Sequence, residues 1–245
     1  MFELFGAALC VTENYPIEEI SCASAGAIVG FLLSCDVPLE EIKDTMFTFD
    51  LKSVIDISLK SLLNNYGLSS LEPLKKILKE QSGDPKFRDV TKYKLHISAY
   101  CFDTCKTVYF SRDTHPDMSV VDAVIMSCSI PIFFVPVQFQ GHYYMDGGTI
   151  ERIPDSPFAL KDPASVIVLE ISLDIETPKD FSKIQNFFLH FFSTILLRQL
   201  KSCRNDYKTV TIPYRNCLNF FIQHEEKLQN FMKGYSQTFY QLINK

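Results

Sequence analysis

The chain has 245 residues, a hydrophobic fraction of 47 % and a formal net charge of −5 at pH 7. This composition excludes a mostly disordered protein, and the length fits one domain with a sizeable core. The acidic balance and the absence of a strong basic cluster argue against nucleic acid as a partner and against electrostatic docking on anionic membranes. No apolar run reaches the roughly 18 residues that a spanning helix needs, so we expect no transmembrane segment.

The eight cysteines carry no zinc or disulfide signature. None forms a C-x-x-C pair, and the closest two, Cys101 and Cys105, have no histidine at a zinc-like offset. The stretch from Met1 to Asn14 has an acidic residue and no basic one before its apolar run, which is not the pattern of a secretory signal. We therefore predict free thiols, no bound metal and a reducing, cytoplasmic setting in which any contact with membranes is peripheral.

The first elements along the chain lead to a sharp turn. Phe2–Val11 has apolar residues at helical spacing, and Ile17–Ile20 follows a turn as a short strand-like segment. Five small residues come next, Cys22 to Gly26, and then an apolar helical run, Ala27–Leu33. A strand, a tight turn with one hydroxyl and a helix are the layout of a nucleophile elbow. Its flanking residues must be small because the strand and the helix nearly touch.

This turn has a catalytic interpretation and a structural one. In the first, Ser24 is a nucleophile, and the backbone N–H groups of Ala25 and Gly26 stabilise an oxyanion with help from the helix dipole. In the second, Ser24 is a helix N-cap among residues that pack closely. The usual elbow pattern is G-x-S-x-G, and this chain has Cys22 at the first glycine. If the Cys22 side chain strains the elbow, glycine at this position would raise activity.

The middle of the chain mixes helical and strand patterns. Ser70 is expected to cap a helix that Gly83 stops, and Ile130-Pro131 is expected to end another. The expected helices are Leu39–Phe47, Lys52–Asn64, Leu71–Gln81 and Ser119–Cys128, and the expected strands are Lys94–Tyr100, Thr107–Phe110, Phe133–Val137 and Gly141–Met145.

A second stretch of interest runs from Met126 to Gly148. It contains Ser127–Pro136, which reads SCSIPIFFVP, and it ends on Asp146-Gly147-Gly148. Two glycines after an aspartate allow the backbone to bend sharply, so that the carboxylate can approach Ser24. The alternative is a surface D-G-G turn, which is common.

Taken together, Cys22–Ala27, Ser127–Pro136 and the D-G-G that follows resemble the patatin-like phospholipase family. In that family the serine of G-x-S-x-G-A pairs with the aspartate of D-G-G or D-G-A, and a stretch of the type A-S-x-A-x-P-x-x-F-x-P precedes the aspartate. The resemblance covers about Phe2 to Leu173. It implies an α/β fold of three layers, with a central, mostly parallel sheet between helices.

The resemblance also implies an activity. Ser24 would be the nucleophile and Asp146 the base of a Ser-Asp dyad, with Gly147 and Gly148 completing the aspartate motif. The reaction would be phospholipase A or lipase chemistry, in which a fatty-acyl ester of a lipid or phospholipid acylates Ser24 and water releases the fatty acid. Neither a metal nor a cofactor is implied.

The sequence departs from the family pattern in two places. No strand and glycine-rich loop, which supply oxyanion-hole N–H groups in the family, precede the first helix, so we expect either a start upstream of Met1, a partner that supplies the loop, or a weakly active relative. Arg152 stands where the family often has asparagine, although Pro154 matches. We expect residues 1–175 to form an N-terminally incomplete catalytic core. A catalytically weak or inactive relative that binds lipid or regulates is the alternative function.

A Ser-His-Asp triad is a further alternative, because His190 and His224 follow Asp146 in the order of α/β-hydrolases. Only 23 residues precede Ser24, and several βα units precede the elbow in that fold, which argues against a triad. The tail, residues 176–245, is expected to be a helical extension packed on the same domain. Its expected elements, after a strand at Ser165–Ser172, are a phenylalanine-rich helix at Phe181–Cys203, a strand at Thr209–Ile212 and a helix at Gln223–Ile243.

Overall fold

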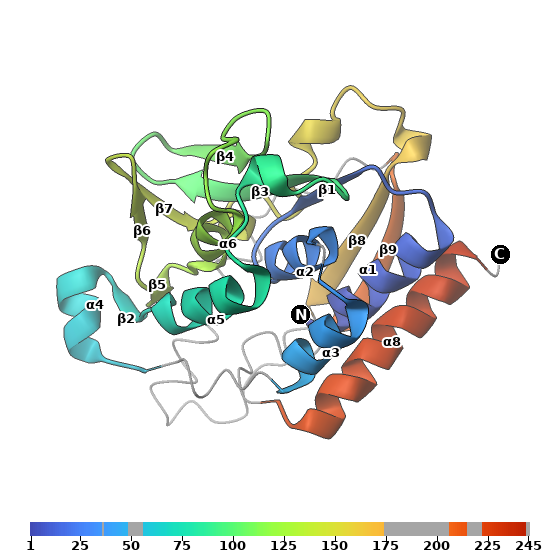
Figure 1. Ribbon diagram of the computed structural model, residues 1–245, viewed down its shortest axis with the longest axis horizontal. Coiled ribbons are helices and arrows are strands. Elements are labelled where there is room, and N and C mark those ends of the chain that lie inside the picture. The colour runs from blue at the N-terminus through green and yellow to red at the C-terminus, as the bar shows by residue number, and fades with distance from the viewer. Residues whose placement is uncertain (36, 49–55, 174–205, 215–221, 244–245) are drawn as a thin grey trace.

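The protein is described here from a computed structural model, in residues 1–35, 37–48, 56–173, 206–214 and 222–243 (Figure 1). The predicted α/β class is confirmed. The helices are α1 (Phe2–Asn14), α2 (Ala25–Ser34), α3 (Leu39–Thr48), α4 (Leu59–Asn65), α5 (Glu72–Ser82), α6 (Val120–Cys128) and α8 (His224–Leu242). The strands are β1 (Glu19–Cys22), β2 (Gly67–Ser69), β3 (Lys94–Cys101), β4 (Lys106–Phe110), β5 (Ile132–Phe134), β6 (Val137–Phe139), β7 (His142–Asp146), β8 (Ile167–Leu173) and β9 (Lys208–Tyr214).

β3 is the strand around which the largest sheet is built. It pairs in parallel with β1 and antiparallel with β4 and β7, and β6 continues the sheet beyond β7. Cys22, at the end of β1, lies opposite Ile97, and Asp146, at the end of β7, lies opposite Ala99. Because β1 and β7 run in opposite directions, their C-terminal ends meet along β3. Two further strand pairs, β2–β5 and β8–β9, are parallel.

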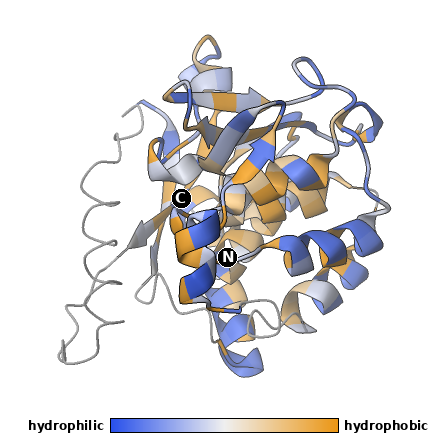
Figure 2. Ribbon diagram, turned by 90° about the vertical axis from the view of Figure 1, so that its left-hand side faces the viewer, coloured by the Kyte–Doolittle hydropathy of each residue, from blue (hydrophilic) through white to orange (hydrophobic). Residues whose placement is uncertain are grey.

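The core lies between this sheet and the helices α2 and α6, which pack on each other and on β3 (Figure 1). Both helices are apolar on nearly every face, as buried helices are. The predicted cap of α6 is confirmed, since the Ser119 hydroxyl accepts the Asp122 N–H at 3.3 Å. Figure 2 shows hydrophobic segments gathered inside the molecule and hydrophilic ones at its periphery.

α8 runs alongside α1, and two glycines allow the close approach (Figure 1). A Cβ on Gly6 would lie 2.0 Å from the Phe231 carbonyl oxygen, and one on Gly234 would lie 2.0 Å from that of Glu3. The apolar spacing of this helix predicts one face made of Leu228, Phe231, Tyr235, Phe239 and Leu242. Phe231 and Leu242 are buried, but Leu228 and Phe239 are not. These two side chains are instead 47 % and 37 % exposed, because the side of α8 that holds Gly234 and Thr238 faces α1.

Most of the other predicted elements lie close to their expected bounds. α5 begins at Glu72, whose N–H donates to the Ser70 hydroxyl, and Gly83 ends it in the left-handed conformation. The helix predicted at Lys52–Asn64 is only partly confirmed: α4 begins at Leu59, after its cap Ser58, and residues 56–58 are not helical. The predicted helix at Phe181–Cys203 lies outside the described residues. Among the helices that are described, none is both long and apolar enough to span a bilayer.

Candidate active site

Ser24 stands at the turn between β1 and α2, in a backbone conformation that few residues other than glycine adopt. Its φ is 54° and its ψ is −129°, and its side chain makes no capping hydrogen bond to α2. A positive φ at a non-glycine residue costs free energy and persists only where the surroundings hold it. The local geometry therefore fits a strained elbow, and it does not fit the N-cap interpretation of Ser24.

The Asp146 carboxylate is the hydrogen-bond partner of the Ser24 hydroxyl. Ser24 Oγ donates to Asp146 Oδ2 at 2.5 Å, and Oδ1 of the same carboxylate accepts the Gly148 N–H at 2.7 Å. Asp146 is only 3 % exposed. The structure thus brings the two sequence-predicted residues together across 122 positions of the chain.

Packing explains why two glycines follow Asp146. A Cβ on Gly147 would lie 2.5 Å from the backbone oxygen of Ser98 in β3, which no real side chain tolerates. A Cβ on Gly148 would lie 3.0 Å from Asp146 Oδ1 and 3.8 Å from Ser24 Cβ. The glycines of D-G-G therefore allow the chain to turn tightly between β3 and Ser24. A turn on the surface would not need glycine at these positions for lack of space.

Burial changes the acidity of the aspartate. Loss of solvent around the carboxylate raises the pKa of Asp146 to about 6, although the hydrogen bonds from Ser24, Gly148 and Thr149 act in the opposite direction. A carboxylate with a pKa of this size is a better proton acceptor than an exposed aspartate, and it is still mostly ionised at neutral pH. The pair has the geometry and the acidity that a serine nucleophile and its base require.

Two side chains that the sequence analysis did not single out hold the backbone of Ser24. Ser127 Oγ accepts the Ser24 N–H at 2.8 Å, and Cys128 Sγ donates to the Ser24 carbonyl oxygen at 3.2 Å. Burial raises the pKa of Cys128 well above its ordinary value, so the group remains a thiol that can donate. The signal for both residues was present in the S-C-S-I-P stretch, but no spacing rule connects that stretch to the elbow.

The two N–H groups expected to bind an oxyanion differ. The Gly26 N–H donates to the Ala23 carbonyl oxygen at 2.9 Å, in the turn that leads into α2. The Ala25 N–H donates no hydrogen bond within the part of the chain that is described, and it lies beside Ser24 at the positive end of the α2 dipole. Of the two, Ala25 is therefore the donor available to a developing negative charge.

Cys22, at the first glycine position of the motif, fits into the elbow without displacing it. Its side chain is buried, and Sγ lies 3.4 Å from the His96 carbonyl oxygen. Burial raises the pKa of Cys22 to about 12, so it is a neutral thiol. Room for the sulfur comes from Gly30 on α2, where a Cβ would lie 2.8 Å from Sγ.

The segment after Asp146 is fastened to the sheet although Arg152 replaces the family's asparagine. Arg152 pairs with Glu170 of β8 at 2.7 Å, and the Tyr109 hydroxyl of β4 donates to Glu151 at 2.6 Å. Ser21 Oγ donates to the Pro154 carbonyl oxygen at 2.6 Å. These contacts tie the segment to three strands, so support for the aspartate loop comes from residues other than the family's usual one.

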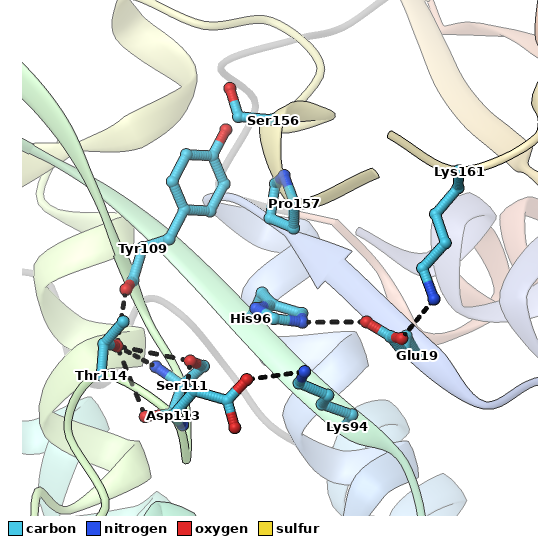
Figure 3. A pocket seen from close by; sticks show the side chains of 10 residues that line it. All are labelled: Glu19, Lys94, His96, Tyr109, Ser111, Asp113, Thr114, Ser156, Pro157 and Lys161. Atoms are coloured by element: carbon cyan, nitrogen blue, oxygen red, sulfur yellow. Dashed lines mark hydrogen bonds and ion pairs between the residues drawn. The ribbon is translucent and has the colours of Figure 1, made fainter. Parts of the chain in front are cut away.

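A separate cavity of about 450 Å³ is lined by residues that include Glu19, where β1 begins, and Lys94, where β3 begins (Figure 3). Neither Ser24 nor Asp146 lines it. Its charged groups are paired with one another: Lys161 contacts Glu19 at 2.8 Å and Lys94 contacts Asp113 at 2.6 Å. The His96 ring lies 3.3 Å from Glu19, and burial lowers the pKa of His96. The charged groups that line the cavity thus already have partners. The pair of Glu19 and Lys161 joins the sheet to the segment that contains Lys161.

The described histidines do not form a triad with Ser24 and Asp146. His96 is buried against Glu19, as expected for a structural residue in a strand. His142 lies near Asp103, with 3.8 Å between Nδ1 and Oδ2, and His224 Nδ1 lies 3.3 Å from the Phe47 carbonyl oxygen. His190 lies outside the described residues.

Three comparisons connect this geometry to known proteins. A family model described as patatin-like phospholipase matches residues 5–158. A probable lipid hydrolase of Invertebrate iridescent virus 6 is 29 % identical over 145 residues, which cover 54 % of this chain and 49 % of that protein. The 1-acylglycerol-3-phosphate O-acyltransferase Pnpla3 of Mus musculus is 30 % identical over 162 residues, which cover 61 % of this chain and 37 % of that protein. The chain thus spans about half the length, or less, of these curated relatives.

A solved structure shares the fold. The type III effector protein ExoU superposes with a TM-score of 0.54 at 17 % sequence identity, and the alignment covers 99 % of this chain and 50 % of ExoU.

Proposed function

The chain belongs to the patatin-like phospholipase family, and from this premise we propose that it hydrolyses fatty-acyl esters of lipids through an acyl-enzyme on Ser24, with Asp146 as the base. The observation that carries the proposal is the 2.5 Å hydrogen bond from Ser24 Oγ to the buried Asp146 carboxylate. The viral relative is named a probable lipid hydrolase, which supports a lipid substrate for this chain. The contact of α8 with α1 supports treating the segment after residue 175 as an extension of the same domain.

The proposed reaction has two halves. In the first, Ser24 Oγ attacks the ester carbonyl carbon while its proton passes to Asp146 Oδ2, and the oxyanion forms beside the Ala25 N–H. The tetrahedral species collapses, the C–O bond of the ester breaks, and Asp146 gives the proton to the departing alcohol. In the second half, water loses a proton to Asp146 as it attacks the acyl-serine, and the fatty acid leaves with Ser24 restored.

Two other outcomes follow from the same site. The mouse relative is named an acyltransferase. In such a reaction a lipid alcohol, instead of water, would attack the acyl-serine and accept the acyl group. Alternatively, the chain could bind lipid without hydrolysing it. It would then keep the fold, but Ser24 would not be acylated. Product analysis separates the first outcome from hydrolysis, and covalent labelling of Ser24 separates the second.

The test is the reaction of the purified chain with a fluorophosphonate probe, followed by intact mass. We expect a mass increase of one probe molecule that Ser24→Ala abolishes and that Asp146→Asn slows by roughly a hundredfold or more. Ser70→Ala removes an exposed hydroxyl at the start of α5 and serves as the matched control. Absence of labelling in a protein with a cooperative thermal transition would overturn the catalytic proposal and leave the lipid-binding alternative.

A further inference from the structure

A cysteine, an aspartate and a histidine converge at the end of the main sheet that lies away from Ser24. Cys101 ends β3, Asp103 lies in the hairpin between β3 and β4, and His142 begins β7. One ligand atom from each lies within 4.8 Å of the other two. We propose that these three side chains bind a zinc ion. The proposal is independent of the activity assigned to Ser24.

The ligand atoms of His142 and Asp103 lie close to the spacing that zinc requires, and all three ligand atoms lie within 4.8 Å of one another. With bonds of about 2.0–2.3 Å, the ligands of a tetrahedral zinc ion lie roughly 3.3–3.8 Å from one another. His142 Nδ1 and Asp103 Oδ2 are 3.8 Å apart. Small side-chain rotations of the two exposed groups would close the cluster around an ion.

The chemistry of the donors selects the class of metal. A thiolate, an imidazole and a carboxylate together suit zinc and similar borderline cations, whereas magnesium and calcium prefer sites made of oxygen alone. Three protein ligands leave a fourth position for water. On binding, the Cys101 S–H bond breaks, its proton passes to the buffer, and the sulfur forms a bond to the metal.

The protein holds the three ligands in place through its backbone. Cys101 pairs with Tyr144 in the β3–β7 register, and the Tyr143 N–H donates to Asp103 Oδ2 at 2.6 Å. The Phe102 N–H in turn donates to the Tyr143 carbonyl oxygen at 2.8 Å. These bonds fix the hairpin against β7 before any ion is present, which lowers the cost of assembling the site.

The three proposed ligands differ in exposure: the sulfur is buried, and the other two groups are open to solvent. Cys101 is 1 % exposed, whereas the side chains of His142 and Asp103 are 47 % and 39 % exposed. An ion can therefore reach the cluster from solvent and finish against the buried sulfur. Tyr144 lies directly opposite Cys101 in the β3–β7 pairing, so its backbone holds Cys101 beside the start of β7.

The test uses the full chain after removal of metal with a chelator. Titration with Co²⁺ should give a sulfur-to-cobalt charge-transfer band that saturates at one equivalent and disappears when Zn²⁺ is added. We expect His142→Gln to lower the affinity for Zn²⁺. The loss should exceed the roughly ten- to hundredfold that removal of a residue outside the ligand set costs. Cys101→Ser should remove the band. Cys105→Ser is the matched control, since it removes the exposed thiol of the same hairpin.

Two results would overturn the proposal. One is Zn²⁺ affinity in His142→Gln equal to that of the unaltered chain, which would place bound metal elsewhere. The other is loss of the cobalt band in Cys105→Ser but not in Cys101→Ser. Because the His142 side chain is 47 % exposed, we expect its variant to fold, so this variant remains decisive even if Cys101→Ser fails to fold.

Discussion

The Ser127 hydroxyl accepts the backbone N–H of Ser24 at 2.8 Å, so a residue outside the dyad supports the strained turn that carries the nucleophile. Without this acceptor the Ser24 N–H would lack its side-chain partner, and a buried polar group left unpaired costs about 1–3 kcal/mol. We expect Ser127→Ala to slow probe labelling of Ser24 by roughly ten- to a hundredfold, because the turn would populate other conformations.

The matched control for this prediction is Ser129→Ala, which removes a hydroxyl from the same helix end. Ser129 Oγ donates to the Ile125 carbonyl oxygen, so its loss leaves the Ser24 backbone untouched. Equal labelling rates in Ser127→Ala and Ser129→Ala, with both variants folded, would mean that the Ser24 turn does not depend on the Ser127 hydroxyl.

The pH dependence of the reaction follows from the acidity of Asp146. Because burial raises the pKa of this carboxyl to about 6, the base is protonated and inactive at lower pH. We expect the labelling rate to rise about tenfold per pH unit below that value and to level off near neutral pH. The rate is measured from pH 4 to pH 9 at constant ionic strength. A rate that is level down to pH 4 would show that Asp146 is not the base, or that its pKa is ordinary.

The same buried carboxylate makes the folded protein less stable at neutral pH. The pKa of Asp146 is higher in the folded state than the ordinary value of 3.8 for an aspartate, so folding favours the protonated form. The stabilisation is fully present below about pH 4 and is lost as the pH rises through 6. At pH 8, Asp146→Asn should therefore raise the free energy of unfolding, by at most about 3 kcal/mol at roughly 1.4 kcal/mol per pKa unit.

The measurement is denaturant unfolding of both proteins at pH 8 and at pH 4, where the advantage of the asparagine variant should shrink. All other titrating groups are common to the two proteins, so their contributions cancel in the comparison. A variant that is less stable at pH 8 by the same amount as at pH 4 would indicate that lost hydrogen bonds, and not the buried charge, dominate at this position.

Local patterns predicted the elements that depend on neighbouring residues. The Ser119 cap, the end of α5 at Gly83 and the strand that became β3 follow from capping chemistry and periodicity, which act over a few positions. Ser24 and Asp146 were predicted as site residues from motifs. The structure now gives a steric reason for one small residue of these motifs, Gly147. Whether the two carry the proposed chemistry is the subject of the labelling test.

Contacts between distant residues could not be predicted in this way. The bond from Ser24 to Ser127 joins positions 103 apart, and nothing in either local pattern encodes it. In α8 the apolar stripe pointed to Leu228 and Phe239, but close approach to α1 favours the side with Gly234. Hydrophobic periodicity ranks side chains by polarity, whereas a close helix contact selects for small ones.

Cys22 and Gly30 are complementary, and a double-mutant cycle should reveal it. A Cβ at position 30 would lie 2.8 Å from Cys22 Sγ, and overpacking of this kind costs about 1–3 kcal/mol. In Cys22→Ala the sulfur is gone, so Gly30→Ala should cost less, or stabilise by up to about 1 kcal/mol through the better helix propensity of alanine.

The cycle is measured as the free energy of unfolding of the unaltered chain, Cys22→Ala, Gly30→Ala and the double variant. We expect a coupling of roughly 1–3 kcal/mol in favour of the double variant. Additive effects would instead mean that the helix start shifts to make room for the sulfur. Labelling of Ser24 in Cys22→Ala adds a second readout: since the cysteine fits without strain, removing its sulfur should not accelerate the reaction.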